Sequence, residues 1–293
     1  MKLKRNLFSS PLCFVVNMVM VYVVYEICRL VFLATNWSMF SEAITWSSFW
    51  EITRGGLMFD TSAILYTNAL YALMMLFPIH YKETAIYQNI AKWVFLVCNS
   101  ICVVANLADC VYFKYTIRRT TVTVFSEFQN ENNLGSIFGA EVINHWYLVV
   151  IGILLIVGMW YLYRMPKGQI PVQISKPYKA KGMAEYYVLQ ALCLALFVPL
   201  CVAGIRGGFT TAVRPITISN ANQYVDRPQE AAIVLNTPFS IIRTIGKSVF
   251  VVPNYYSQQE LDDIYSPVHN PGDSLVARKK NVVVIIIESF GRE

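Results

Sequence analysis

The strongest constraint in this sequence is a series of long apolar segments that carry almost no charge. A helix needs about 20 apolar residues to cross the roughly 30 Å hydrocarbon layer of a bilayer. Five segments reach or approach that length, at residues 7–25 (continuing to about 34), 61–81, 93–113, 142–163 and 186–205. We therefore expect residues 1–205 to form an α-helical polytopic membrane domain of five transmembrane helices. The first segment is too long for a cleaved signal peptide, so we expect it to remain as an anchor.

The composition changes near residue 205. Charged residues make up 14% of the chain, against about 25% in a typical soluble domain. The first 205 residues hold 25 of them and the last 88 hold 17, so charge density rises toward the C-terminus. This pattern indicates a membrane domain followed by soluble sequence. The net charge of +6 is dilute and scattered, which argues against nucleic acid as a partner.

All seven cysteines precede Gly204, inside the apolar segments, and none forms a C-x-x-C or Cys/His metal motif. A disulfide framework is therefore not expected. Cys98 and Cys102 are one turn apart on an expected helix. Packing inside the bundle is favoured for this pair over a redox or metal site.

The distribution of basic residues predicts the orientation. The N-terminal segment and the loops at 82–92 and 164–185 carry ten Lys and Arg, whereas the loops at 35–56 and 114–141 carry four. Basic loops stay preferentially in the cytoplasm. We therefore expect a cytoplasmic N-terminus, and everything after residue 205 outside. The absence of cysteines from that outer part fits a bacterial exported domain, so the expected location is the bacterial cytoplasmic membrane.

Polar side chains in the expected spans require hydrogen-bond partners in the protein or a bound ligand, because lipid chains offer none. Asp109, Arg118 and Arg119 are candidate contacts for a lipid headgroup, since guanidinium groups bind phosphate in a bidentate way. The alternative is hydrogen bonding that only holds the helices together. Both interpretations stay open for these three residues, and the second is favoured for Asn68 and Asn99.

Residues 206–280 are expected to be an extracytoplasmic linker with short helices. Phe239, Ile242 and Ile245 form one apolar stripe that would dock on the membrane or on a soluble domain. Ser257 and Glu260 have the spacing of a helix capping box. No chemistry is expected from this linker itself.

Six consecutive β-branched residues, 282–287, predict a strand buried on both faces, as in a mainly parallel sheet. Glu288 follows directly, at the end where such sheets bind ligands. It is a candidate metal ligand, a general base, or simply the solvated end of the strand. Because one strand cannot form a sheet, we expect residues 281–293 to begin an α/β domain that the sequence leaves incomplete.

At these residues the sequence resembles the lipoteichoic acid synthase and phosphoglycerol transferase family, within the sulfatase and alkaline phosphatase superfamily. The most specific stretch is Asn281 to Phe290, with Glu288 and Ser289 ending the strand. Other stretches that look familial are Phe59-Asp60-Thr-Ser-Ala-Ile, Asn106-Leu-Ala-Asp109, Arg206-Gly-Gly208 followed by Arg214-Pro215, and Asn236-Thr-Pro-Phe.

The resemblance implies a sulfatase-like catalytic domain outside the membrane that holds a divalent cation, Mn²⁺ or Mg²⁺. Carried over by position, Glu288 would be the first metal ligand, and a carboxylate oxygen suits either ion. The threonine nucleophile of such enzymes has no counterpart up to Glu293, so no catalytic residue is assigned. The 293-residue chain alone is therefore expected to be inactive.

The expected function is anchoring of a transferase that moves phosphoglycerol or phosphoethanolamine from a membrane phospholipid to a glycan or polymer acceptor. One alternative is a membrane-anchored sulfatase or phosphodiesterase of the same superfamily. A second is a non-enzymatic membrane scaffold. A transporter is disfavoured, because no inverted repeat or pair of Gly/Pro-broken helices is evident.

Overall fold

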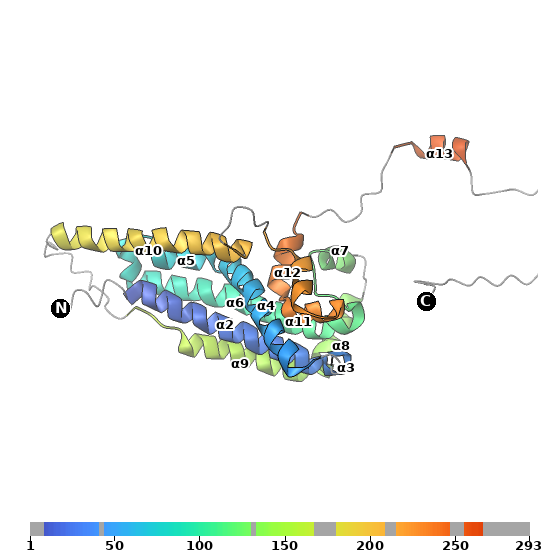
Figure 1. Cartoon of the computed structure of the whole chain (residues 1–293), viewed down its shortest axis with the longest axis horizontal. Coiled ribbons are helices and arrows are strands. Elements are labelled where there is room, and N and C mark those ends of the chain that lie inside the picture. The colour runs from blue at the N-terminus through green and yellow to red at the C-terminus, as the bar shows by residue number, and fades with distance from the viewer. Residues whose placement is uncertain are drawn as a thin grey trace, which may run out of the picture. The chain divides into compact units, whose positions relative to one another are not determined.

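A computed structural model provides the structure, which describes residues 9–40, 44–129, 133–166, 180–208, 215–246 and 255–265. These residues are mostly helical and contain no β-strand (Figure 1). The chain divides into two compact units, Met1–Lys247 and Ser248–Glu293. Each unit is considered by itself below.

Three helices in the first unit are long and apolar enough to cross a bilayer. They are α2 (Ser9–Thr35), α6 (Ala85–Thr116), and the part of α10 (Ala180–Arg206) from Tyr186 onward. They coincide with the first, third and fifth predicted spans. The helix α6 packs against both α2 and α9 (Trp146–Leu162), and α10 packs against α4 (Trp46–Thr67). The chain is thus a helical protein with several candidate membrane spans.

The second predicted span, 61–81, is not one helix. The helix α4 begins at Trp46, carries charged residues in its first half, and ends at Thr67; α5 (Ala69–Leu76) follows. Asn68 separates them, and its side-chain amide donates to the Ile64 carbonyl at 3.1 Å. Asparagine competes with helix backbone in this way, and periodicity alone did not reveal the break.

The fourth predicted span, 142–163, is also interrupted. The helix α8 (Leu134–Asn144) ends at Asn144, and α9 begins at Trp146, with His145 between them. Residues Gly135–Asn144 and Trp146–Leu162 are bent by 82° relative to each other. Counting this pair as one span gives four candidate spans in the described residues, so five spans are not confirmed.

The first part of the predicted linker belongs to the helical unit. It contains η2 (Ile218–Tyr224), η3 (Pro228–Glu230), α11 (Ala231–Val234) and α12 (Thr237–Thr244). Every residue from 230 to 240 is buried, and α11 and α12 pack against α4. We call residues 230–240 the docked segment. Docking of Phe239 among the helices of this unit was not anticipated from the sequence, which pointed to a membrane surface or a soluble domain.

In the second unit the structure describes only residues 255–265. The helix α13 (Gln258–Ile264) starts at Ser257, whose hydroxyl accepts from the Glu260 amide while the Glu260 carboxylate accepts from the Ser257 amide. The predicted capping box is therefore confirmed. The predicted strand, 282–287, and Glu288 lie outside the described residues.

Candidate functional site

Two buried arginine–aspartate pairs lie where the docked segment meets the bundle. In the first pair, Arg29 of α2 bonds to Asp60 of α4, with 2.6 Å between Nη2 and Oδ2. Arg29 also pairs with Glu26, three residues earlier on the same helix, and its Nε donates to the Ile233 carbonyl at 3.1 Å. Asp60 is fully buried and accepts a second bond from Asn236 Nδ2, at 2.8 Å. This pair therefore joins two helices to the docked segment.

Gly56 makes room for the Arg29 guanidinium. A Cβ at this position would lie 2.3 Å from Arg29 Cζ, far inside van der Waals contact. Gly56 precedes Asp60 by one helical turn on α4, so both residues face α2. A glycine inside a helix is unfavourable by about 1 kcal/mol relative to alanine, and here its small size admits a buried cation.

The second pair joins Asp109 of α6 to Arg119, just after that helix, at 3.1 Å. Arg119 Nε donates to the Ala232 carbonyl at 2.7 Å, and its guanidinium lies 3.6 Å from the centre of the Phe32 ring. Thr237 Oγ1 donates to Asp109 Oδ2 at 2.7 Å. The second arginine thus holds the docked segment by its backbone, in the same manner as Arg29.

Asparagine side chains complete the contact. Asn106 Oδ1 accepts from the Thr237 amide at 3.0 Å. Asn236 caps α12 by accepting from the Phe239 amide at 2.8 Å, and Phe239 packs edge-on against Phe59 with ring centres 4.9 Å apart. Five polar side chains from the bundle and two from the docked segment therefore form one buried network, namely Arg29, Asp60, Asn106, Asp109, Arg119, Asn236 and Thr237.

The network can position a chain segment, because each charged member is bonded to an opposite charge and to the docked segment. A buried ion pair persists only when its remaining hydrogen-bonding groups are also satisfied. Of the predicted headgroup contacts, Asp109 and Arg119 are brought together and are buried. Arg118 precedes Arg119 directly and is exposed.

Sequence reasoning found Asp109 and Arg119 but not their partners. Asp60, Asn236 and Thr237 were noted only as parts of familial stretches. The available signal was a run of polar residues, Asn236-Thr-Pro, in a segment that otherwise reads as apolar. For Asn68 and Asn99 the interhelical interpretation is confirmed, since their amides bond reciprocally at 3.1 and 2.8 Å.

Metal ligands are not gathered in the described part of the chain, where no group of three His, Cys, Asp or Glu is arranged to hold an ion. Glu288 lies outside that part, so the structure does not test its predicted role. Comparison with protein families, with characterised proteins and with solved structures finds no match to this chain.

Proposed function

We propose that this chain is the membrane-anchoring part of an extracytoplasmic, metal-dependent transferase. The reaction moves phosphoglycerol or phosphoethanolamine from a membrane phospholipid to a glycan or polymer acceptor. The N-terminus lies in the cytoplasm and the residues after 205 lie outside. Support comes from the familial stretch at 281–290 and from the apolar helices that precede it.

The observation that supports an anchoring role best is the docked segment. A simple tether needs no buried contacts between the helical bundle and the sequence that follows the last apolar helix. Here, Arg29 of α2 binds the Ile233 carbonyl, and Arg119, just after α6, binds the Ala232 carbonyl. The bundle thereby fixes the chain 48 residues before Asn281, counted from Ile233.

No chemical step is assigned to the described residues. In the proposed enzyme, Glu288 would contribute to a Mn²⁺ or Mg²⁺ site, and the ion would stabilise charge on phosphoryl oxygens. Arg118 is exposed near the end of α6 and remains the proposed headgroup contact outside the network. Asp109 and Arg119 support Arg118 by ordering the loop after α6 in which Arg118 lies.

The test is transfer of a radiolabelled headgroup in bacterial membranes that contain the native gene product. We expect label from phosphatidylglycerol or phosphatidylethanolamine to enter a glycan or polymer fraction, with Mn²⁺ dependence. Glu288→Gln should abolish transfer, while Glu260→Gln, an exposed control on α13, should not. Release of label into water without acceptor product would instead support the hydrolase, and absence of any release would support the scaffold.

A second measurement addresses the headgroup contact. Arg118→Ala should weaken transfer from the lipid more than cleavage of a short soluble phosphodiester. Equal loss on both substrates would remove Arg118 from the proposal, because a residue that reads a membrane-bound headgroup has no role with a soluble substrate.

A further inference from the structure

One face of α4 carries a polar pocket and an apolar groove in succession. Glu51, Arg54, Met58 and Thr61 follow one another at spacings of three, four and three residues, which places them on one side of the helix. The first two line the polar pocket, and the other two line the apolar groove. The polar pocket followed by the apolar groove matches the polar end and the apolar end of an amphiphilic molecule.

The polar pocket has a volume of about 290 Å³ and is lined by Glu51, Arg54, Gln223 and Tyr224. Glu51 and Arg54 are exposed, and the described residues provide no ion-pair partner for either. Tyr224 is fixed, because its ring lies directly over Gly55, where a Cβ would come within 2.5 Å of Cγ. The pocket thus combines an available guanidinium, an available carboxylate and a rigid aromatic wall.

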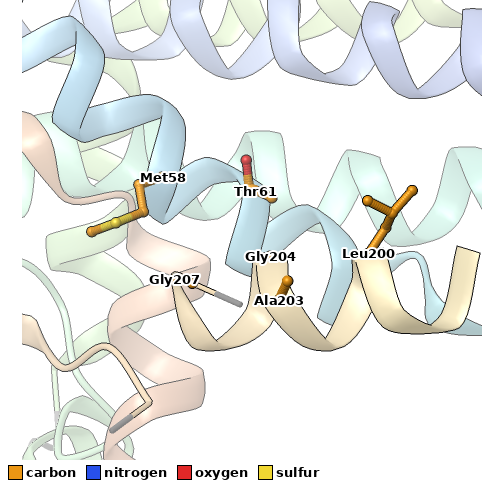
Figure 2. A pocket seen from close by; sticks show the side chains of 7 residues that line it. Met58, Thr61, Leu200, Ala203, Gly204 and Gly207 are labelled. Atoms are coloured by element: carbon orange, nitrogen blue, oxygen red, sulfur yellow. The ribbon is translucent and has the colours of Figure 1, made fainter. Parts of the chain in front are cut away.

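The apolar groove has a volume of about 400 Å³ and lies between α4 and α10 (Figure 2). From α4 it is lined by Met58 and Thr61, and from α10 and the residues after it by Leu200, Ala203, Gly204, Gly207 and Gly208. Only 11% of the apolar window of α10 is buried within the protein. In a bilayer the groove would therefore open toward acyl chains.

The walls of the two cavities touch each other. The Tyr224 hydroxyl, on the wall of the polar pocket, lies 3.6 Å from Met58 Sδ, on the wall of the groove. From Glu51 to Thr61 the helix rises about 15 Å at 1.5 Å per residue, close to half of the roughly 30 Å hydrocarbon layer. Trp46 and Trp50, in the first turns of α4, are 76% and 56% exposed, as expected for residues at headgroup depth.

We propose that this face of α4 binds one phospholipid. Arg54 binds the phosphate, because guanidinium matches phosphate oxygens in a bidentate way. An ionised carboxylate accepts hydrogen bonds only, so Glu51 selects a headgroup that carries N–H or O–H donors. One acyl chain lies in the groove between α4 and α10. The site does not depend on the proposed transferase function, and its test measures binding alone.

The test is native mass spectrometry of the full chain released from detergent that contains one added lipid at a time. The lipids are phosphatidylethanolamine, phosphatidylcholine and diacylglycerol with identical acyl chains. We expect ethanolamine lipid to be retained most, choline lipid less and diacylglycerol least. Arg54→Gln should lower retention of the ethanolamine lipid about tenfold, the loss expected for one hydrogen-bonded charge, and should leave diacylglycerol unchanged.

Two matched controls make the result decisive. Lys114→Gln removes the same charge from an exposed position on α6 and should leave lipid retention unchanged. Leu200→Trp should obstruct the groove and lower retention of all three lipids, whereas Leu196→Trp, at another exposed position one turn earlier, should not. The proposal is overturned if Arg54→Gln retains lipid as Lys114→Gln does, or if Leu200→Trp retains lipid as Leu196→Trp does. Each comparison requires variants whose elution volume and melting temperature match those of the native chain.

Discussion

Arg29 and Ile233 are joined by a hydrogen bond that spans 204 residues of the chain, from the guanidinium Nε to the carbonyl oxygen at 3.1 Å. One buried side chain of the first helix therefore binds the backbone of a segment that follows the last candidate span. Arg119 does the same to Ala232, at 2.7 Å. Adjacent carbonyls of the docked segment are thus held by two cations, each of which is balanced by its own aspartate.

Loss of Arg29 should destabilise the bundle strongly. Arg29→Met keeps an unbranched side chain but leaves Asp60 buried without its ion-pair partner, which typically costs about 3–5 kcal/mol. The measurement is the free energy of unfolding in mixed micelles. Lys114→Met, at an exposed position, should change it by less than about 0.5 kcal/mol. A loss below about 1 kcal/mol for Arg29→Met would show that the pair does not hold the fold together.

Thr237 should contribute through its hydroxyl group alone. Thr237→Val keeps the shape of the side chain and removes the donor to Asp109 Oδ2, so the expected loss is about 1–3 kcal/mol of unfolding free energy. Ser136→Ala, at an exposed position on α8, is the matched control. The effect should largely vanish in an Asp109→Ala background, where the acceptor of the Thr237 hydroxyl is absent. Full additivity of the two substitutions would contradict the network.

The helix α13 should depend on pH. Hydrogen bonds from the Ser257 amide and hydroxyl hold the pKa of Glu260 below its ordinary value of 4.5. Because the pKa of Glu260 is lower in the folded chain than in the unfolded chain, the cap stabilises the helix fully above pH 4.5. This stabilisation is lost as the pH falls through the pKa of Glu260 in the folded chain. Amide hydrogen exchange at residues 257–264 should therefore accelerate below pH 4.5, and Glu260→Gln should remove that dependence. Exchange that is independent of pH, after correction for its intrinsic rate, would contradict the cap.

The apolar helices could be predicted from sequence because their signal is local. Residues 9–35, 85–116 and 186–206 each contain long apolar runs, and lipid-facing helices require little else. The breaks at Asn68 and His145 were missed, because a polar residue within an apolar run changes hydropathy very little. At Asn68 the side chain also forms a reciprocal amide pair with Asn99, a contact between helices that no single segment reveals.

The docked segment was missed for a related reason. Residues 230–240 are too short for a span, and they follow a stretch rich in loop-forming residues, so they were read as a connector. Their burial depends on Asp60, Asp109 and two arginines from elsewhere in the chain. Arg29 and Glu26 are three residues apart on one helix, a spacing that can be recognised in the sequence, whereas nothing local pairs Arg29 with Asp60, which comes from another helix.

Glycine substitutions offer a test in which the sign of the effect differs between two positions. Alanine is favoured over glycine inside a helix by about 1 kcal/mol, so an unobstructed Gly→Ala change should be neutral or stabilising. Gly158 of α9 is such a position, since a Cβ there meets nothing within 4 Å. Gly158→Ala should therefore raise the unfolding free energy by up to about 1 kcal/mol.

Gly56→Ala should have the opposite effect. Its Cβ would lie 2.3–2.6 Å from three guanidinium atoms of Arg29, and Arg29 cannot move away without losing Asp60 and the Ile233 carbonyl. We expect a loss of about 3–5 kcal/mol, the range for a disrupted buried charge pair. The loss should be much smaller in an Arg29→Met background, where the displaced cation is absent. Equal losses in the two backgrounds would mean that Gly56 serves helix packing in general and not the Arg29 site.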